Sequence, residues 1–224
     1  MNSNLRLRTL TLSLAACILY APAATAALVS FSGFSSDGHP VSGSADFTLN
    51  AGADTVTVKL TNTTKLTLDA GELFTGLDFS LGGLTPTMAS TADTGFERSV
   101  NGAGGFVDSG GIVNLTWSLV PIGSGVYQLN FNPNAKHAII GPPTAGSYAL
   151  ANGSIKSNPG HDPFAAEMAT FVLSVPGLEA STPVVVRSWR FGTELDPAFV
   201  PEPTTTALAV IGLAAAGWTR RRRG

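Results

Sequence analysis

The stretch VSGSADFTLNAGADTVTVKL, residues 41–60, decides the fold class of this chain of 224 residues. Apolar and polar residues alternate from Val41 to Leu49 and again from Val56 to Leu60, which is the period of a strand with one buried face. The residues between the two runs are small or turn-forming, at positions 50–54. The two runs are therefore predicted to pair as a β-hairpin.

The same alternation recurs along the middle of the chain and predicts several more strands, with one short helical turn within residues 68–74. These strands are expected at residues 29–31, 77–81, 113–119, 127–131, 171–175 and 184–191. Strands of this number and length predict an all-β fold, an antiparallel β-sandwich with a jelly roll as its variant. The Gly-, Ser-, Thr- and Pro-rich segments 82–111 and 132–165 are predicted to be long loops, where binding would be located.

Charge and cysteine content exclude several classes of function. Between residues 9 and 219 the chain has fifteen acidic and seven basic residues, a net charge of −8, against −2 for the whole sequence. So acidic a body is not expected to bind nucleic acid, which requires clustered Lys and Arg. The single cysteine, Cys17, lies in an N-terminal apolar run, so the body has no disulfide, thiolate catalysis or cysteine metal site.

The N-terminus has the pattern of a secretory signal peptide over residues 1–26. Arg6 and Arg8 precede the apolar run LTLSLAACILYA, residues 10–21. Ala24 and Ala26 then supply the small residues that signal peptidase recognises. A second interpretation is that residues 14–17, LAAC, form a lipobox with an acylated Cys17, although the three residues that follow remain apolar.

The C-terminus has three parts in a fixed order. Pro201-Glu202-Pro203 comes first, the apolar run ALAVIGLAAAGW follows at residues 207–218, and Arg220, Arg221, Arg222 and Arg223 come last. As a helix, residues 204–219 span about 24 Å, which is barely enough to cross a hydrocarbon core of about 30 Å. The arginines favour the cytoplasmic side, and the prolines keep the preceding segment from extending the helix.

This tripartite tail, together with the signal peptide, resembles the PEP-CTERM sorting signal of Gram-negative bacteria. The resemblance implies recognition by exosortase, a membrane-embedded, cysteine-protease-like transpeptidase, at a sorting motif formed by Pro201, Glu202 and Pro203. It also implies transient anchoring in the inner membrane. Residues 59–64, 72–79 and 190–194 resemble, more weakly, recurring β-domains of exosortase-dependent surface proteins. The alternative for the tail is a permanent C-terminal membrane anchor after a proline-rich linker.

The predicted organisation is therefore a signal peptide (1–26), a β-sandwich surface domain (27–199) and a sorting and anchor segment with a single hydrophobic helix (200–224). The body has neither G-x-S-x-G nor H-E-x-x-H. His161-Asp162 and Asp37-Gly38-His39 are interpreted as turns, and Asp69 and Glu72 as caps of the short helical turn. We expect no catalytic residue, cofactor or metal, with a loop Ca²⁺ site left open.

Three functions are compatible with these features. The first is a non-enzymatic surface or extracellular-matrix protein, sorted by exosortase and associated with exopolysaccharide. The second is a carbohydrate-binding β-sandwich module, which needs exposed aromatic side chains to stack on sugar rings. Its large candidates are Trp117, Trp189, Tyr127 and Tyr148, at least two of which are in phase with core positions. The third is a secreted hydrolase, which needs acidic residues that converge in a cleft.

The cleavage site gives the first testable prediction. The exported protein should begin at Ala27, because signal peptidase cuts after the second small residue of the A-x-A pattern. N-terminal sequencing of the exported form measures this directly. A blocked, acylated Cys17 at the N-terminus would instead establish the lipoprotein interpretation.

Overall fold

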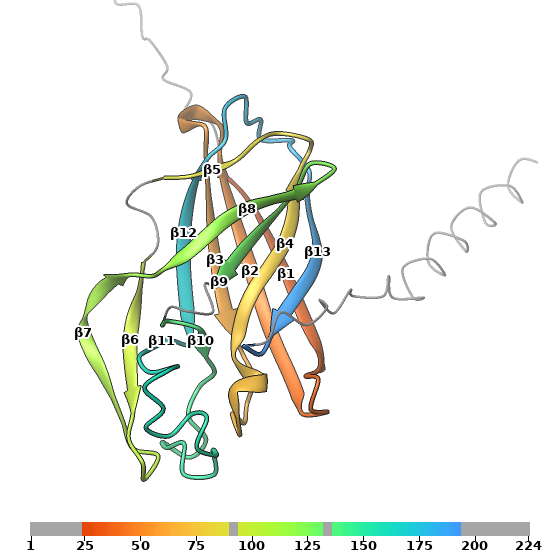
Figure 1. Ribbon diagram of the computed structural model, residues 1–224. Coiled ribbons are helices and arrows are strands. Elements are labelled where there is room, and N and C mark those ends of the chain that lie inside the picture. The colour runs from red at the N-terminus through yellow and green to blue at the C-terminus, as the bar shows by residue number, and fades with distance from the viewer. Residues whose placement is uncertain (1–23, 90–93, 132–135, 194–224) are drawn as a thin grey trace, which may run out of the picture.

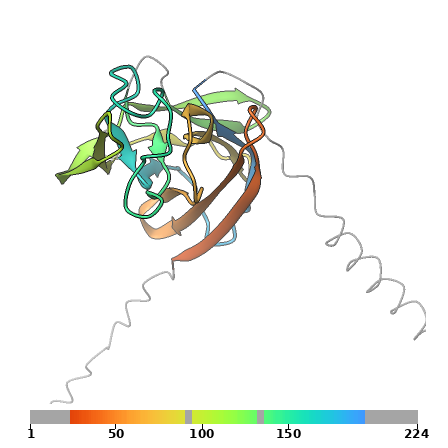
Figure 2. The same cartoon turned by 90° about the horizontal axis from the view of Figure 1, so that it is seen from below.

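The computed structural model describes residues 24–89, 94–131 and 136–193 (Figure 1). This described part is all-β, with 54% of its residues in strands and 4% in helical turns. The thirteen named strands are joined by hydrogen bonds into one connected network. That network folds over into two layers that face each other across the core, as the end-on view shows (Figure 2). The predicted β-sandwich is confirmed.

The first layer has the order β1-β2-β3-β12, all antiparallel, with the short β5 beside β12. Its strands are β1 (Thr25–Phe34), β2 (Pro40–Asn50), β3 (Thr55–Asn62), β5 (Thr87–Met88) and β12 (Met168–Ser174). The predicted hairpin is its centre, since Leu49 pairs with Val56 and Phe47 with Val58. A 3₁₀ turn, η1 (Ala51–Ala53), connects the two strands.

The second layer has the order β13-β4-β9-β8, also antiparallel. Its strands are β4 (Phe74–Leu81), β8 (Trp117–Gly123), β9 (Val126–Phe131) and β13 (Val184–Phe191). The 3₁₀ turn η2 (Ala70–Glu72) precedes β4 and corresponds to the predicted short helical turn. The expected strand over residues 113–119 is divided between β7 and β8, because its first part pairs with β6 and its second with β9.

Four further strands, together with the short β5, lie where long loops were expected, and they correct that prediction. The four are β6 (Thr94–Val100), β7 (Phe106–Asn114), β10 (Ile139–Ile140) and β11 (Phe164–Ala166). β6 and β7 form a hairpin within the predicted loop 82–111. β10 and β11 pair in parallel and connect β4 of the second layer to β6. The sandwich is therefore closed along one side by strands, and it is not purely antiparallel.

Aromatic rings cross the core from one layer to the other. Phe47 of β2 lies 5.5 Å from Phe79 of β4, between ring centroids. Trp117 of β8 lies 5.2 Å from Phe171 of β12. Phe31 of β1 stacks on Trp189 of β13 at 5.8 Å. Such ring pairs add about 0.5–1.5 kcal/mol each beyond the area they bury, so they fix the two layers face to face.

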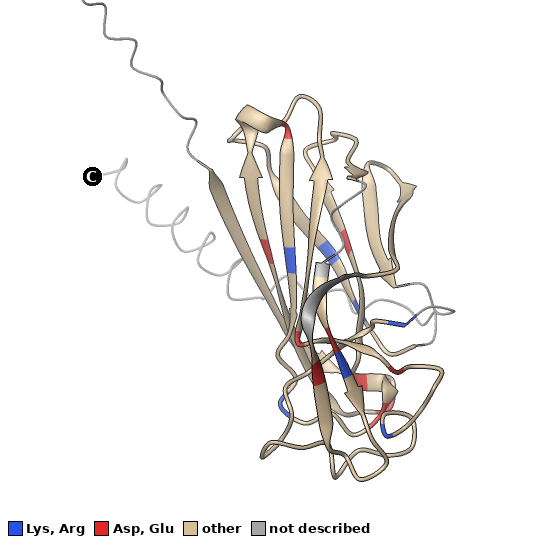
Figure 3. Ribbon diagram, turned by 90° about the vertical axis from the view of Figure 1, so that its left-hand side faces the viewer, with Lys and Arg blue, Asp and Glu red and all other residues tan. Residues whose placement is uncertain are grey.

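The chain enters and leaves this body at opposite ends. Thr25, at the start of β1, pairs with Leu49 beside the β2–β3 turn. Phe191, at the end of β13, pairs with Phe74 at the start of β4. Charged residues are few along the strands and more frequent at the end where β13 finishes, the lower end of Figure 3. We call this end, with its loops, the tail end of the sandwich.

The inter-layer rings give a stability prediction. Phe47→Ala should destabilise the protein by about 3–5 kcal/mol, because it removes a fully buried ring from between the layers. Urea unfolding of the exported protein measures the loss. Phe34→Ala, a change of the same size at a side chain that is 60% exposed, should stay within about 0.5 kcal/mol. Equal losses for the two variants would contradict the proposed core.

Candidate functional site

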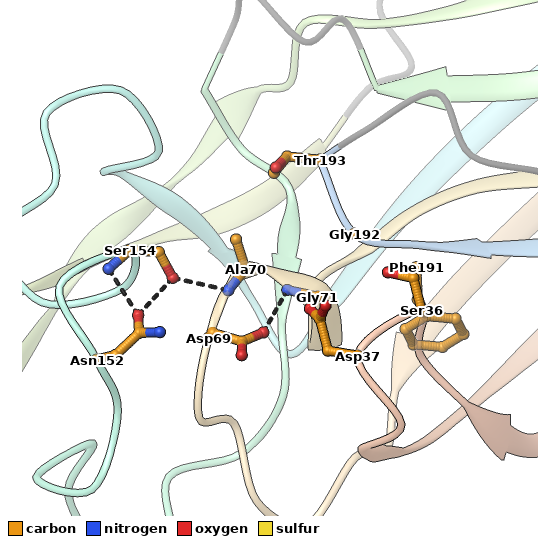
Figure 4. Close-up of a pocket in the computed structure, with 10 residues that line it drawn as sticks. All are labelled: Ser36, Asp37, Asp69, Ala70, Gly71, Asn152, Ser154, Phe191, Gly192 and Thr193. Atoms are coloured by element: carbon orange, nitrogen blue, oxygen red, sulfur yellow. Dashed lines mark hydrogen bonds between the residues drawn. The ribbon is translucent and has the colours of Figure 1, made fainter.

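A polar pocket of about 320 Å³ opens at the tail end of the sandwich (Figure 4). Four separate parts of the chain line it: the β1–β2 loop, η2, the loop around residue 152 and the last residues after β13. The ten residues drawn are Ser36, Asp37, Asp69, Ala70, Gly71, Asn152, Ser154, Phe191, Gly192 and Thr193. Two of these are acidic and none is basic, so the described lining is negatively charged.

The turn η2 forms the floor of the pocket, and its own side chains cap it. Asp69 Oδ1 accepts a hydrogen bond from the Gly71 amide at 2.7 Å. Glu72 Oε2 accepts from the amides of Asp69 and Leu68, each at 2.7 Å. This reciprocal arrangement is a capping box. It bears out the prediction that Asp69 and Glu72 cap a helical turn.

His39 locks the β1–β2 loop to this turn. Its Nδ1 lies 2.5 Å from Glu72 Oε1 and 3.6 Å from Asp69 Oδ2. Glu72 has a fully buried side chain, so its charge must be satisfied within the protein. His39 and the backbone amides of Leu68 and Asp69 do so, which makes Glu72 a structural anchor and not a free acid or base.

The same three residues are of the types that bind metals, and their ligand atoms lie within 4.8 Å of one another. The separation of 2.5 Å between His39 Nδ1 and Glu72 Oε1 is that of a hydrogen bond. Two ligands that each stand about 2.0–2.2 Å from a zinc ion, at tetrahedral angles, are farther apart than that. The observed geometry therefore fits a proton between the two atoms better than a metal ion bound by both.

Asp37 and Asp69 converge above Gly71. A Cβ atom on Gly71 would lie 2.8 Å from both Asp37 Oδ2 and Asp69 Oδ1, so the two oxygens are no farther apart than twice that distance. Figure 4 shows the two side chains on either side of Gly71. Asp37 is exposed and makes no hydrogen bond with any of the described residues. Any side chain at position 71 would occupy the space that the two carboxylates face.

Asn152 and Ser154 form the opposite wall. Ser154 Oγ accepts a hydrogen bond from the Ala70 amide at 2.8 Å and donates one to Asn152 Oδ1 at 2.7 Å. The Asn152 amide donates to the Leu68 carbonyl at 2.6 Å. These bonds fasten the loop to η2 and leave the Asn152 Nδ2 group unbonded within the described part of the chain.

A second polar cluster, around Arg98, lies apart from the pocket. The guanidinium bonds Asp108 through two nitrogens, at 2.7 and 2.8 Å, and also bonds Tyr148 and Glu167. Its Cζ lies 4.4 Å from the centre of the Phe106 ring. The cluster ties the β6–β7 hairpin to the loop after β10 and to the segment between β11 and β12.

Burial and charge pairing shift the pKa values of this cluster. Burial lowers the pKa of Arg98, but its bonds to Asp108, Tyr148 and Glu167 outweigh that effect and raise it overall. The hydrogen bond from Arg98 lowers the pKa of Asp108. Burial raises the pKa of Tyr148 to about 12, and its hydroxyl donates to the Gly141 carbonyl at 2.6 Å. The cluster is a structural clamp.

Other residues singled out in the sequence have structural surroundings. Asp162 accepts from Ser99 Oγ and from the Val100 amide, each at 2.8 Å, so it pins its loop to β6. His161 Nδ1 lies 2.7 Å from the Ser154 carbonyl oxygen. The four large aromatic candidates for sugar stacking are all buried and belong to the hydrophobic core. They are Trp117, Trp189, Tyr127 and Tyr148.

The predicted targeting residues are mostly outside the described structure. Ala24 precedes β1 and Ala26 lies within it, paired with Thr48. Residues 194–224 are not described, and they include Pro201, Glu202 and Pro203, the arginines at 220–223 and the expected hydrophobic helix. In the part of the chain that is described, no helix is long and apolar enough to cross a membrane.

Comparison with known proteins identifies the tail. The model of the PEP-CTERM protein-sorting motif matches residues 199–223, which confirms the resemblance found in the sequence. The motif implies export, exosortase-dependent processing and transient association with the membrane on the way to the cell surface. No curated protein matches the chain.

The Arg98 clamp predicts a pH-dependent stability. Because the folded pKa of Asp108 is below its unfolded value of about 3.9, the pairing stabilises the protein above that pH. The contribution is lost as pH falls through the folded pKa. Asp108→Asn should therefore lower the urea midpoint at pH 7, and its difference from wild type should shrink in acid. Asp37→Asn, which has no arginine partner, is the control. A difference that stays constant down to pH 2 would contradict this role.

Proposed function

We propose that this protein is a non-enzymatic surface or extracellular-matrix protein, which exosortase processes and which then associates with exopolysaccharide. The sorting motif at residues 199–223 carries the proposal. The match begins at residue 199, eight positions after Phe191, where β13 ends as the last of the described strands. The body is thus a folded cargo with the processing signal attached directly to one end.

The short connection limits where the body can stand during sorting. The eight residue-to-residue steps from Thr193 to Pro201 span at most about 28 Å when fully extended. While residues 204–219 are held in the inner membrane, the tail end of the sandwich must lie close to the membrane surface. Cleavage near Pro201 would free that end, together with the polar pocket beside Thr193.

A role without catalysis fits the chemistry of the tail end. Glu72 has both carboxylate oxygens engaged by described hydrogen bonds, and Asp69 Oδ1 is held by the Gly71 amide. A hydrolase needs an acid and a base that are free to exchange protons with substrate. Only Asp37 in this group is exposed and free of described hydrogen bonds. These side chains are better suited to holding a shape and accepting hydrogen bonds.

A carbohydrate-binding role remains a second candidate, because the pocket favours it. A flat stacking surface is less favoured, since Phe34 and Phe96, the exposed aromatic residues of the described part, are 60% and 46% accessible but far apart in the sheet. They belong to β1 and β6, which β2, β3 and β12 separate. Sugar recognition by this domain would therefore depend on hydrogen bonds more than on ring stacking.

The tail gives the prediction that tests the sorting proposal. Replacing Pro201, Glu202 and Pro203 with alanines should leave membrane insertion intact but stop processing, so full-length protein should accumulate in the inner membrane. Membrane fractionation measures where the protein accumulates, and its intact mass shows whether it is full-length. Replacing Arg220 to Arg223 with neutral residues is the matched change. It should weaken retention of the protein in the inner membrane, because it removes the charges that resist translocation.

The mass of wild-type material at its final location decides between the two interpretations of the tail. The processed protein should lack the residues beyond the motif. Wild-type surface protein that still carries residues 207–223 would establish a permanent anchor and refute the sorting proposal.

A further inference from the structure

We propose that the polar pocket at the tail end of the sandwich binds one uncharged or amino-bearing sugar unit, and that it is the contact through which the protein associates with polysaccharide. This inference rests on the proposed function above, since it names the partner class and the site. It commits to direct recognition of sugar hydroxyl groups by side chains of this chain.

The size of the pocket suits a small ligand. Its volume of about 320 Å³ is at the lower end of the range for small-molecule sites. A sugar unit within a chain or at its end is a small, compact ligand of this class. The apolar groove beside Phe34 is larger, about 580 Å³, but its surface is mostly apolar, and it offers few partners for hydroxyl groups.

The hydrogen-bonding groups match a ligand whose hydroxyls both donate and accept. Asp37 supplies two acceptor oxygens. Asp69 adds Oδ1, which converges with Asp37 Oδ2 above Gly71. This Oδ1 accepts one described hydrogen bond, from the Gly71 amide, and can accept another. Asn152 Nδ2 supplies a donor. A carboxylate accepts hydrogen bonds from two neighbouring hydroxyls at once, so Asp37 and Asp69, converging above Gly71, are suited to a vicinal diol.

Two glycines shape the edge of the pocket, and one of them leaves room for the Asp37 and Asp69 carboxylates to approach each other. At Gly71 a Cβ atom would stand between the two carboxylates, 2.8 Å from each of the two oxygens. At Gly192 the backbone has a φ of 93°, a conformation that favours glycine. Gly192 therefore lets the chain turn out of β13 along the pocket edge.

Charge defines which sugars fit. Two of the ten drawn lining residues are acidic and none is basic, and the chain between residues 9 and 219 carries a net charge of −8. A uronic acid or a phosphorylated sugar would bring a further negative charge next to Asp37 and Asp69, which is unfavourable at this distance. A neutral hexose avoids that repulsion, and a protonated amino sugar would be attracted.

The pocket is also preorganised. Its floor is fixed by the capping box of η2, its β1–β2 wall by His39 and Glu72, and its far wall by Ser154 and Ala70. Groups that are already ordered lose little entropy when a ligand binds. The recognising atoms of Asp37 and Asn152 therefore stand on a rigid frame.

The test uses the exported protein and oligosaccharides of matched length, made of glucose, glucosamine or galacturonic acid. Calorimetric titration should show binding of the glucose or the glucosamine oligomer and none of the galacturonate oligomer. Asp37→Asn should weaken binding about tenfold or more, because a hydrogen bond to a charged group is lost. Glu179→Gln removes the same charge at an exposed position outside the pocket and should leave binding unchanged.

Several results would overturn the inference. These are preferential binding of the galacturonate oligomer, no binding of any of the three, or equal binding by wild type and Asp37→Asn. Loss of binding on addition of a chelator would also overturn direct recognition, since it would show that a metal ion makes the contact. A thermal unfolding curve for Asp37→Asn like that of wild type would show that any loss of binding is local.

Cosedimentation with the producing cell's own exopolysaccharide separates the two proposals. If wild type and Asp37→Asn sediment equally with that polymer, association stands and the pocket assignment fails. If wild type does not sediment at all, the association itself fails. If wild type sediments with the polymer and Asp37→Asn sediments in a smaller amount, the result supports both the association and the pocket assignment.

Discussion

The two layers depend on aromatic side chains that reach from one sheet to the other. Phe47 with Phe79, Trp117 with Phe171 and Phe31 with Trp189 join β2 to β4, β8 to β12 and β1 to β13. Each pair connects segments that are far apart in sequence, so the contacts form only when both sheets are complete. β1 has no fully buried residue, and Phe31 packs against the core together with Ala27 and Val29. Phe31 also stacks on Trp189 and Phe191 of the second layer.

The tail end of the sandwich depends on a different interaction: the buried carboxylate of Glu72 needs hydrogen-bond partners within the protein. Its partners are the amides of Leu68 and Asp69 and the imidazole of His39. A buried charge left without partners costs several kcal/mol, so the β1–β2 loop and η2 must assemble together. Nearby, the Asn62 side chain bonds the carbonyls of Glu72 and Ile139 and joins β10 to the same turn. The shape of the pocket is a consequence of these bonds.

Sequence patterns predicted those parts of the fold in which one face of a strand is buried. Residues 41–60 have the predicted pairing, and Val184–Phe191 form a strand with the predicted bounds. The β6–β7 hairpin was missed because its glycines and hydroxyl residues resemble a loop. Arg98 ties it to the rest of the fold through partners that lie ten to sixty-nine positions away. The pocket could not be predicted for the same reason. Its carboxylates, at 37 and 69, come together only through tertiary structure, whereas the sorting motif is contiguous and was readable directly.

The sorting signal and the body differ in what their sequences must preserve. The signal works through linear order, because a protease needs an extended segment and a membrane needs an apolar run with charges behind it. The body instead depends on buried aromatic pairs and on a few buried charges with partners, which come together only in the folded chain. The pocket lies where the two meet, beside Thr193 and at the opposite end from Thr25. A ligand bound there would sit at the end of the body from which the chain continues to the sorting motif at residues 199–223. Under the proposed sorting, removal of the tail would release this end, and the pocket with it, from the membrane.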